Sequence, residues 1–176
     1  NYWGGNDKGS ELTIHMPKSI RVSFDGVSSD INVENLHASA EVKTVSGSIV
    51  ANNLSERIEL SSVSGDIDSK RLSGKVSLAS VSGDVTDRES SGRLSLRAVS
   101  GEIDAKSTAK EVTVENVSGD IQLTLNEVDE LSVSNVSGDF DASLSLNDDG
   151  VIKMSSVSGG LALKFQSDVQ ASFKLS

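Results

Sequence analysis

Apolar and polar residues alternate in short stretches along most of this chain, and the alternation returns at a fixed interval. The segments SSVSGDID (61–68), ASVSGDVT (79–86) and RAVSGEID (97–104) show the repeated unit. Its valine recurs after 18, 18, 18, 18, 18, 19 and 21 residues. The valines are Val27, Val45, Val63, Val81, Val99, Val117, Val136 and Val157. Such regular recurrence is more typical of a structural repeat than of a catalytic motif.

Four further columns of mostly apolar residues keep the register of the valines. They lie five and three residues before each valine, and four and six residues after it. Around Val81 these positions hold Val76, Leu78, Val85 and Asp87. Alternation with a period of two is typical of strands that bury one face. Each unit therefore predicts two short strands, and we expect the valine column to form a buried stripe together with the other four.

The length of the unit fits one turn of a flattened β-solenoid. Eighteen extended residues reach about 60 Å, enough for two strands and two crossings of the gap between two sheets. The predicted fold class is all-β: a single-stranded β-solenoid (β-helix) of about nine coils of 18 residues, right-handed because that hand is the commoner one. A triangular helix built from hexapeptides would need an apolar residue every six positions. Ser69 and Lys75, which follow Val63 at that spacing, exclude it.

We expect a single domain over residues 1–176. Residues 1–26 are predicted to form an N-terminal cap and a first irregular coil, 27–160 the regular repeats, and 161–176 the last coil. Phe173–Ser176 has the pattern of a strand with Lys174 as its only charge. An unprotected strand at the end of a sheet can pair with other molecules. We therefore expect self-association through this C-terminal edge, or a partner that covers it.

Composition narrows the classes of function. The formal net charge of −10 repels nucleic acid and anionic membranes, and the longest basic feature is the pair Lys70–Arg71. The absence of cysteine excludes disulfides, thiol catalysis and cysteine-based zinc sites. No apolar run approaches the roughly 20 residues of a membrane span. Because the chain begins at Asn1 rather than at Met, we expect a processed or trimmed segment.

The recurring Ser-Gly-Asp string predicts a turn with a bend or a close backbone approach. Ser29 occupies the glycine position in the first unit, so we interpret the string as tolerant of other residues. Its acidic position forms a column that we expect to point outward. The column is Asp66, Asp84, Glu102, Asp120 and Asp139. One carboxylate per coil is too few for Ca²⁺, which takes six to eight oxygens, so no metal is expected. A calcium-dependent repeat protein remains an alternative.

Two irregular places are candidate ligand sites. The inward positions of one coil hold Asp87 and Ser90, and Thr108 follows at the neighbouring position of the next coil. We interpret these three residues as a local opening of the edge, with Arg88 or Arg93 as counter-charge. A ligand notch is the alternative.

The second place is the turn where the 19- and 21-residue units carry their extra residues. It contains Asp129, Glu130, Asp148 and Asp149. Insertions in repeat proteins map to loops on one face, which is often the binding face. The segment NDDG (147–150) is also a favourable turn sequence.

No catalytic constellation is recognisable. The two histidines, His15 and His37, lie more than a coil apart, no Asp–His–Ser arrangement is suggested, and no GxSxG motif occurs. We expect no catalytic residue and no cofactor, and hence no enzyme activity. A carbohydrate-active β-helix enzyme remains an alternative, although such enzymes usually carry long loops with clustered Asp, Arg or Lys.

The segment MPKSIRVSFDGVSSDINVENL (16–36) and the serial VSGD-type units after it resemble a bacterial adhesin-like family of β-strand-repeat domains of unknown function. The likeness runs from about Leu12 to Leu175. It implies a β-helical fold and an exported protein, periplasmic or at the cell surface. The expected function is an adhesin-like, non-catalytic binding or structural module of the cell envelope. Its expected partner is a surface protein or a glycan, with no nucleic acid and no membrane insertion by this segment.

Overall fold

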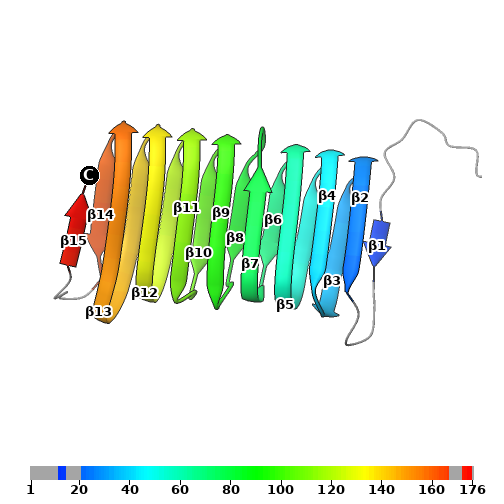
Figure 1. Ribbon diagram of the computed structural model, residues 1–176, viewed down its shortest axis with the longest axis horizontal. Helices are drawn as coiled ribbons and strands as arrows, with labels where there is room; N and C mark the ends of the chain where they lie inside the picture. The colour runs from blue at the N-terminus through cyan, green and yellow to red at the C-terminus, as the bar shows by residue number, and fades with distance from the viewer. Residues whose placement is uncertain (1–11, 15–20, 167–171, 176) are drawn as a thin grey trace, which may run out of the picture.

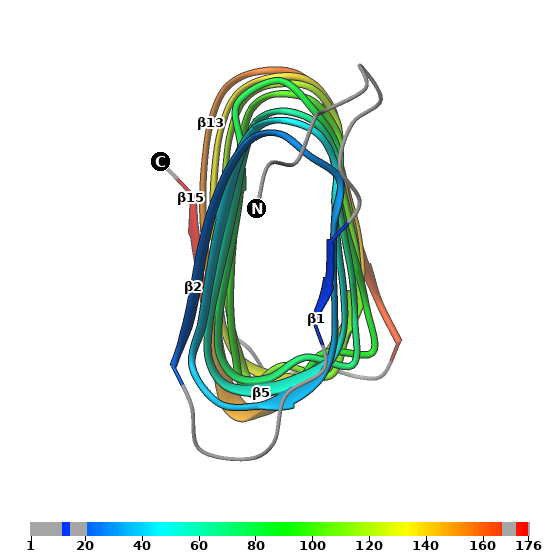
Figure 2. The ribbon, with the colours of Figure 1, turned by 90° about the vertical axis from the view of Figure 1, so that its right-hand side faces the viewer.

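A computed structural model of the chain describes residues 12–14, 21–166 and 172–175. In this part of the chain all regular elements are strands, which coil into a β-solenoid of about eight turns, close to the nine expected (Figure 1). Seen along its axis, each coil is a flattened loop with two long sides and two turns (Figure 2). The all-β solenoid prediction is confirmed, whereas the hand of the coil stays a prediction.

Fifteen strands form one continuous parallel sheet that winds around the solenoid. They are β1 (Leu12–Ile14), β2 (Val22–Ser28), β3 (Ile31–His37), β4 (Ala40–Ser46), β5 (Ile49–Ser64), β6 (Ile67–Lys70), β7 (Ser73–Ser80), β8 (Val85–Arg88), β9 (Arg93–Ser100), β10 (Ile103–Ser107), β11 (Glu111–Ser118), β12 (Ile121–Ser137), β13 (Phe140–Ser158), β14 (Leu161–Phe165) and β15 (Ser172–Leu175). β5, β12 and β13 continue through the lower turn of Figure 1, at which most other coils break into two strands.

The register between coils is the one that the repeat predicts. Ile49 pairs with Ile67, Ile67 with Val85, and Val85 with Ile103, so that equivalent residues stack on one another. The backbone amide of Ile67 donates a hydrogen bond of 2.9 Å to the carbonyl of Asp84 in the next coil. Each coil is therefore held by hydrogen bonds to its two neighbours.

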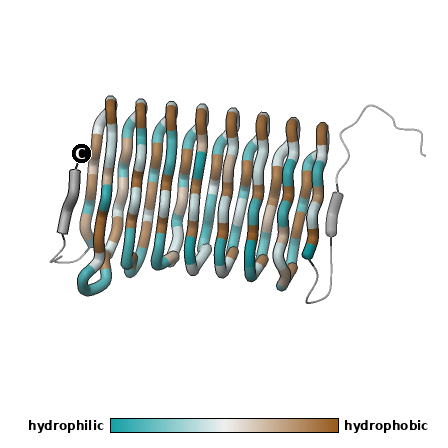
Figure 3. The backbone as a smooth tube through the Cα atoms, viewed as in Figure 1, coloured by the Kyte–Doolittle hydropathy of each residue, from teal (hydrophilic) through white to brown (hydrophobic). Residues whose placement is uncertain are grey.

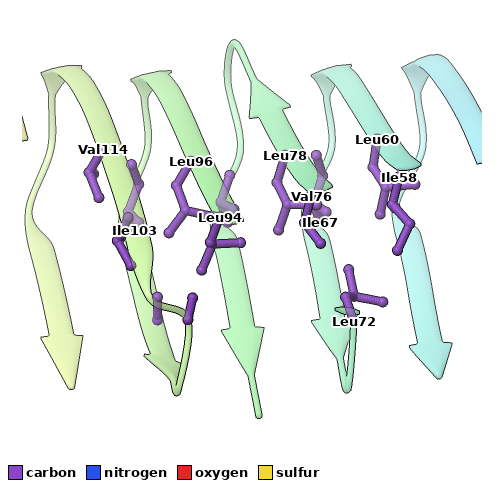
Figure 4. Packing of buried hydrophobic residues seen from close by; sticks show 14 of the residues in the cluster. Ile58, Leu60, Ile67, Leu72, Val76, Leu78, Leu94, Leu96, Ile103 and Val114 are labelled. Carbon is purple, nitrogen blue, oxygen red and sulfur yellow. The ribbon is translucent and has the colours of Figure 1, made fainter. Parts of the chain in front are cut away.

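The core lies between the two long sides of the loop, and four of the five predicted columns fill it. Figure 4 labels members of three of these columns, among them Val76, Leu78 and Ile67. Val76, Leu78 and Val85 of one coil are each at most 1% exposed. Burial ends at the last coil, where Leu161 is 44% exposed. Phe24, at the other end, is half-buried against the core. Most of the predicted N-terminal cap, with His15, lies outside the described residues.

The fifth column, the valines, contradicts the prediction of a buried stripe. Val63, Val81, Val99 and Val117 are 43%, 44%, 40% and 46% exposed. The reason is parity: each valine lies three positions after a residue of the buried column, as Val81 does after Leu78, and an odd spacing in a strand changes the face. The residue just before the valine points inward instead, although it is usually polar.

These inward polar residues remain buried because they hydrogen-bond across coils. The Ser62 hydroxyl donates to the Gly47 carbonyl at 3.3 Å, and the Ser80 hydroxyl to the Gly65 carbonyl at 3.2 Å. A buried hydroxyl costs little when its bond is made. This pairing turns the neighbouring valine outward in coil after coil.

The corrected register makes a testable prediction about two residues three positions apart. Leu78→Asp places a carboxylate in the core and should lower the free energy of unfolding by more than about 4 kcal/mol. Val81→Asp loses only half of a valine's burial and should cost about 1 kcal/mol. Urea denaturation followed by circular dichroism measures both. Equal losses for the two variants would contradict the register.

Candidate functional site

The eight outward valines form one continuous line, here called the valine ridge, along the upper turns. Its members are Val27, Val45, Val63, Val81, Val99, Val117, Val136 and Val157. They account for eight of the eleven large apolar side chains that are exposed in the described part of the chain. Figure 3 shows the upper turn of each coil as apolar. Apolar exposure on this protein is therefore concentrated on one edge.

The ridge is partly stabilised by contacts among its own members. The six inner valines are 40–48% exposed, whereas Val27 and Val157 at the two ends are 71% and 78% exposed. Each end valine has one neighbour in the ridge and each inner valine has two, so the second neighbouring coil covers roughly a third of an inner side chain. The remaining surface faces solvent, and no described segment packs over it.

A row of serines follows the ridge, one residue after each valine. It comprises Ser28, Ser46, Ser64, Ser82, Ser100, Ser118, Ser137 and Ser158, all of which are exposed. None of these hydroxyls forms a side-chain hydrogen bond with another described residue. The ridge and the serine row together form an uncharged strip with a regular repeat.

Glycine is required beside this strip because the coils approach each other there through their backbones. A Cβ atom on Gly65 would lie 2.1 Å from the carbonyl oxygen of Gly47, and one on Gly83 would lie 2.3 Å from that of Gly65. The interpretation of the motif as tolerant is therefore wrong within the stack. Ser29 is accepted because it opens the column, and the next member, Gly47, makes the close approach to it.

The acidic column is exposed, as expected, and it forms a ladder along the glycines. The Asp66 carboxylate accepts a hydrogen bond of 2.9 Å from the backbone amide of Asp84, and the Asp84 carboxylate one of 2.8 Å from that of Glu102. Asp120 and Asp139 repeat the arrangement further along. These bonds between charged acceptors and backbone amides offset the repulsion between neighbouring carboxylates. The carboxylates thus have a structural role, because each of these hydrogen bonds joins two neighbouring coils.

The glycine stack can be tested with one substitution and a matched control. Gly101→Ala places a methyl group 2.3 Å from the Gly83 carbonyl oxygen and should lower the free energy of unfolding by about 3 kcal/mol. Gly160→Ala meets only the Asp139 side chain, at 3.0 Å, and should cost less than about 1 kcal/mol. Thermal unfolding compares them. A harmless Gly101→Ala would show that the coils do not stack this closely.

The predicted notch is closed rather than open. Asp87 and Ser90 are both 0% exposed, and only Thr108 of the three predicted residues faces solvent. The expected counter-charges are engaged elsewhere, Arg88 with Asp104 and Arg93 with Glu111. The interpretation as an opening of the edge is therefore wrong, and Asp87 is a carboxyl group in the core.

Hydrogen bonding around Asp87 favours a protonated carboxyl. Its Oδ1 lies 2.6 Å from the Ser69 hydroxyl and 2.5 Å from the Ser90 hydroxyl, while its buried Oδ2 has no partner. The Ser69 hydroxyl also lies 3.2 Å from the carbonyl of Thr86, yet it has one proton for these two acceptors. If Oδ1 carries a proton, it can donate that proton to the Ser69 hydroxyl oxygen, and the Ser69 proton is then available to the Thr86 carbonyl. Burial raises the pKa of Asp87 above its ordinary value, against the smaller lowering by the two serines.

This raised pKa predicts a pH dependence. The folded state holds the Asp87 proton more tightly than the unfolded chain, in which the pKa is about 4. The associated stability is present below about pH 4 and is lost as the pH rises through the folded-state pKa. Asp87→Asn removes this loss, so the variant should gain stability relative to the wild type as the pH rises. Urea titrations from pH 4 to 8 measure the difference, and parallel pH profiles would contradict it.

The predicted loop residues lie at the lower turn, which accommodates the extra residues of the 19- and 21-residue units. The pairing of β12 with β13 is irregular between Leu125 and Glu130, so the insertion is located where we expected it. The Asn147 amide donates a hydrogen bond of 2.5 Å to Asp129, and Lys153 pairs with Glu130 at 2.7 Å. Asp148 and Asp149 are exposed. The structure does not group these acids as metal ligands, and a binding role for this turn stays a prediction.

Other candidate chemistry is sparse in the described residues. His37 Nδ1 lies 2.9 Å from the exposed Ser55 hydroxyl, and no described carboxylate hydrogen-bonds the ring.

A pocket of about 370 Å³ opens near the last coil. It is lined by Val133, Asn135, Phe140, Met154, Ser155, Ser156 and Leu161. Among residues 12–14, 21–166 and 172–175, no three His, Cys, Asp or Glu side chains are grouped as metal ligands. The same residues include no helix long and apolar enough to cross a membrane.

The sequence pattern identifies the valine column, the acidic column and Asp87, but it does not predict that the valines are exposed. It placed the valines in the core and so did not predict the ridge, although counting the parity from the buried columns would have revealed it. The hydrogen-bond ladder of the carboxylates had no signal beyond their spacing.

The comparison with protein families identifies a family for this chain. The model of the family described as Toastrack DUF4097 matches residues 58–176, which is more than half of the chain. The comparison with curated proteins gives no match, and neither does the comparison with solved structures.

Proposed function

The chain belongs to the Toastrack DUF4097 family. We propose that it is an adhesin-like, non-catalytic binding module of the bacterial cell envelope. The valine ridge carries this proposal. Eight apolar side chains in register, flanked by free hydroxyls, form an exposed strip of a kind that marks interaction sites more often than chance exposure does. The rigid parallel stack holds the strip straight without help from a partner.

The geometry also suggests what kind of partner fits. At about 4.8 Å per coil, the ridge is about 34 Å long and one side chain wide. A linear or flat partner with apolar groups, such as a surface protein or the apolar face of a glycan, can contact all eight coils. The acidic ladder beside the strip disfavours anionic partners, nucleic acid among them.

The chemistry of the buried groups supports binding rather than catalysis. Asp87, which the sequence marks as an anomalous inward residue, has a raised pKa. Its side chain is 0% exposed and so cannot reach a substrate in this conformation. The exposed pair of His37 and Ser55 lacks a described carboxylate to orient it. Hydrolysis of a polysaccharide by this chain, lost on replacing His37, would support the alternative of a carbohydrate-active enzyme.

Adhesion measurements test the proposal. Beads coated with the chain are tested for retention on cell-envelope preparations and on arrayed glycans. Val63→Ser/Val99→Ser/Val117→Ser should reduce retention at least tenfold, because it removes apolar contact from three coils. Val50→Ser is the matched control, since Val50 is 42% exposed but lies on a strand outside the ridge. Equal retention by all three proteins, each checked for an unchanged melting temperature, would refute the proposed role of the ridge.

A further inference from the structure

We propose that the valine ridge binds a second copy of this chain, ridge to ridge, with the two rods parallel. This inference rests on the proposed function, because it names one partner of the same surface. It starts from the repeat distance. A partner can match every valine with an equivalent group of its own when those groups recur at the spacing of the coils, about 4.8 Å. A second copy has that spacing along its whole length.

The ridge is also self-complementary, as a symmetric dimer requires. In a dimer with a twofold axis, the same patch of both copies forms the interface and each residue meets an equivalent one. The ridge and the serine row present no charged side chain, so two such strips meet without burying an unpaired charge. The methyl groups of the valines would fill the contact, and the serine hydroxyls would line its margins.

The charges beside the ridge select the relative direction of the rods. The acidic ladder follows one side of the ridge only, three residues after five successive valines, Val63 to Val136. A twofold axis perpendicular to the rods makes them antiparallel and places the two ladders opposite each other. An axis along the rods makes them parallel and places the ladders on opposite margins of the interface.

In the parallel arrangement, each ladder faces the column two residues before the valines in the other copy. That column carries Asp25, Lys43, Arg97 and Glu115 among uncharged residues, so its charges of opposite sign balance. The parallel dimer thus avoids a repulsion that the antiparallel one must bear.

The size of the strip sets the strength of the contact. A line about 34 Å long and one or two side chains wide covers less than the roughly 800 Å² per partner of a standard stable interface. Each copy also carries a net charge of −10. We therefore expect a reversible dimer at high concentration that salt strengthens, because salt screens the repulsion between the copies.

Cysteine crosslinking reads out both contact and direction, since the chain has no cysteine of its own. Val45→Cys and Val136→Cys lie near opposite ends of the ridge. In parallel rods, each variant alone should form disulfide-linked dimers under mild oxidation, and an equimolar mixture should form no mixed dimer. Antiparallel rods would give mainly the mixed dimer, which would overturn the assigned direction. Val50→Cys, equally exposed but outside the ridge, should form dimers at least tenfold more slowly.

Sedimentation equilibrium provides the second measurement. The wild type should associate with rising concentration and more so at 0.5 M than at 0.05 M NaCl, whereas Val63→Ser/Val99→Ser/Val117→Ser should remain monomeric. Crosslinking no faster than that of Val50→Cys, or association that survives the serine substitutions, would overturn the proposal. The second result would point instead to the exposed strand β14 at the C-terminal edge. Retention of beads at concentrations where the chain is monomeric tests the proposed function separately, so one can fail without the other.

Discussion

The close backbone approach at the glycine stack is the constraint on which the rest of this structure depends. At the upper turn, the carbonyl oxygen of one coil lies where a Cβ atom of the next would stand, so the two coils meet without side chains between them. The parallel hydrogen bonds, the inward serines and the carboxylate ladder all require that spacing. Because the spacing is the same in every coil, each feature of one turn is reproduced as a row. The valine ridge is one of these rows, and its straightness follows from the stack.

The sequence was sufficient to predict the fold because the repeat is long, regular and alternating. A period of 18 with two alternating stretches defined the solenoid, and Leu78 and Val85 are buried as their columns require. The hydrophobicity of the valines predicts a buried column, whereas their parity relative to Leu78 and its equivalents places them on the outer face. Burial of Ser62 and Ser80 in preference to a neighbouring valine depends on a hydrogen bond to a carbonyl in another coil, and composition carries no sign of that bond.

The candidate site was less predictable for a related reason. Asp87 was recognised as an anomaly in an apolar column, which is correct, but its surroundings were not deduced. Ser69 and Ser90 form a small polar cluster with it in the core, so the coil closes around the carboxyl group. Whether an anomalous polar residue opens an edge or builds an internal network depends on neighbours one coil away. Those neighbours can be identified only when the register between coils is known for every residue.

The two turns of the coil tolerate change to different extents, and this difference bears on how the protein can evolve. The coils of 19 and 21 residues accommodate their additional residues at the lower turn, while the upper turn keeps its register throughout. An in-frame duplication of one whole unit would therefore add a rung without disturbing the existing ones. Each added rung would lengthen the exposed strip by one valine, so natural selection could adjust the avidity of the surface by varying the number of repeats.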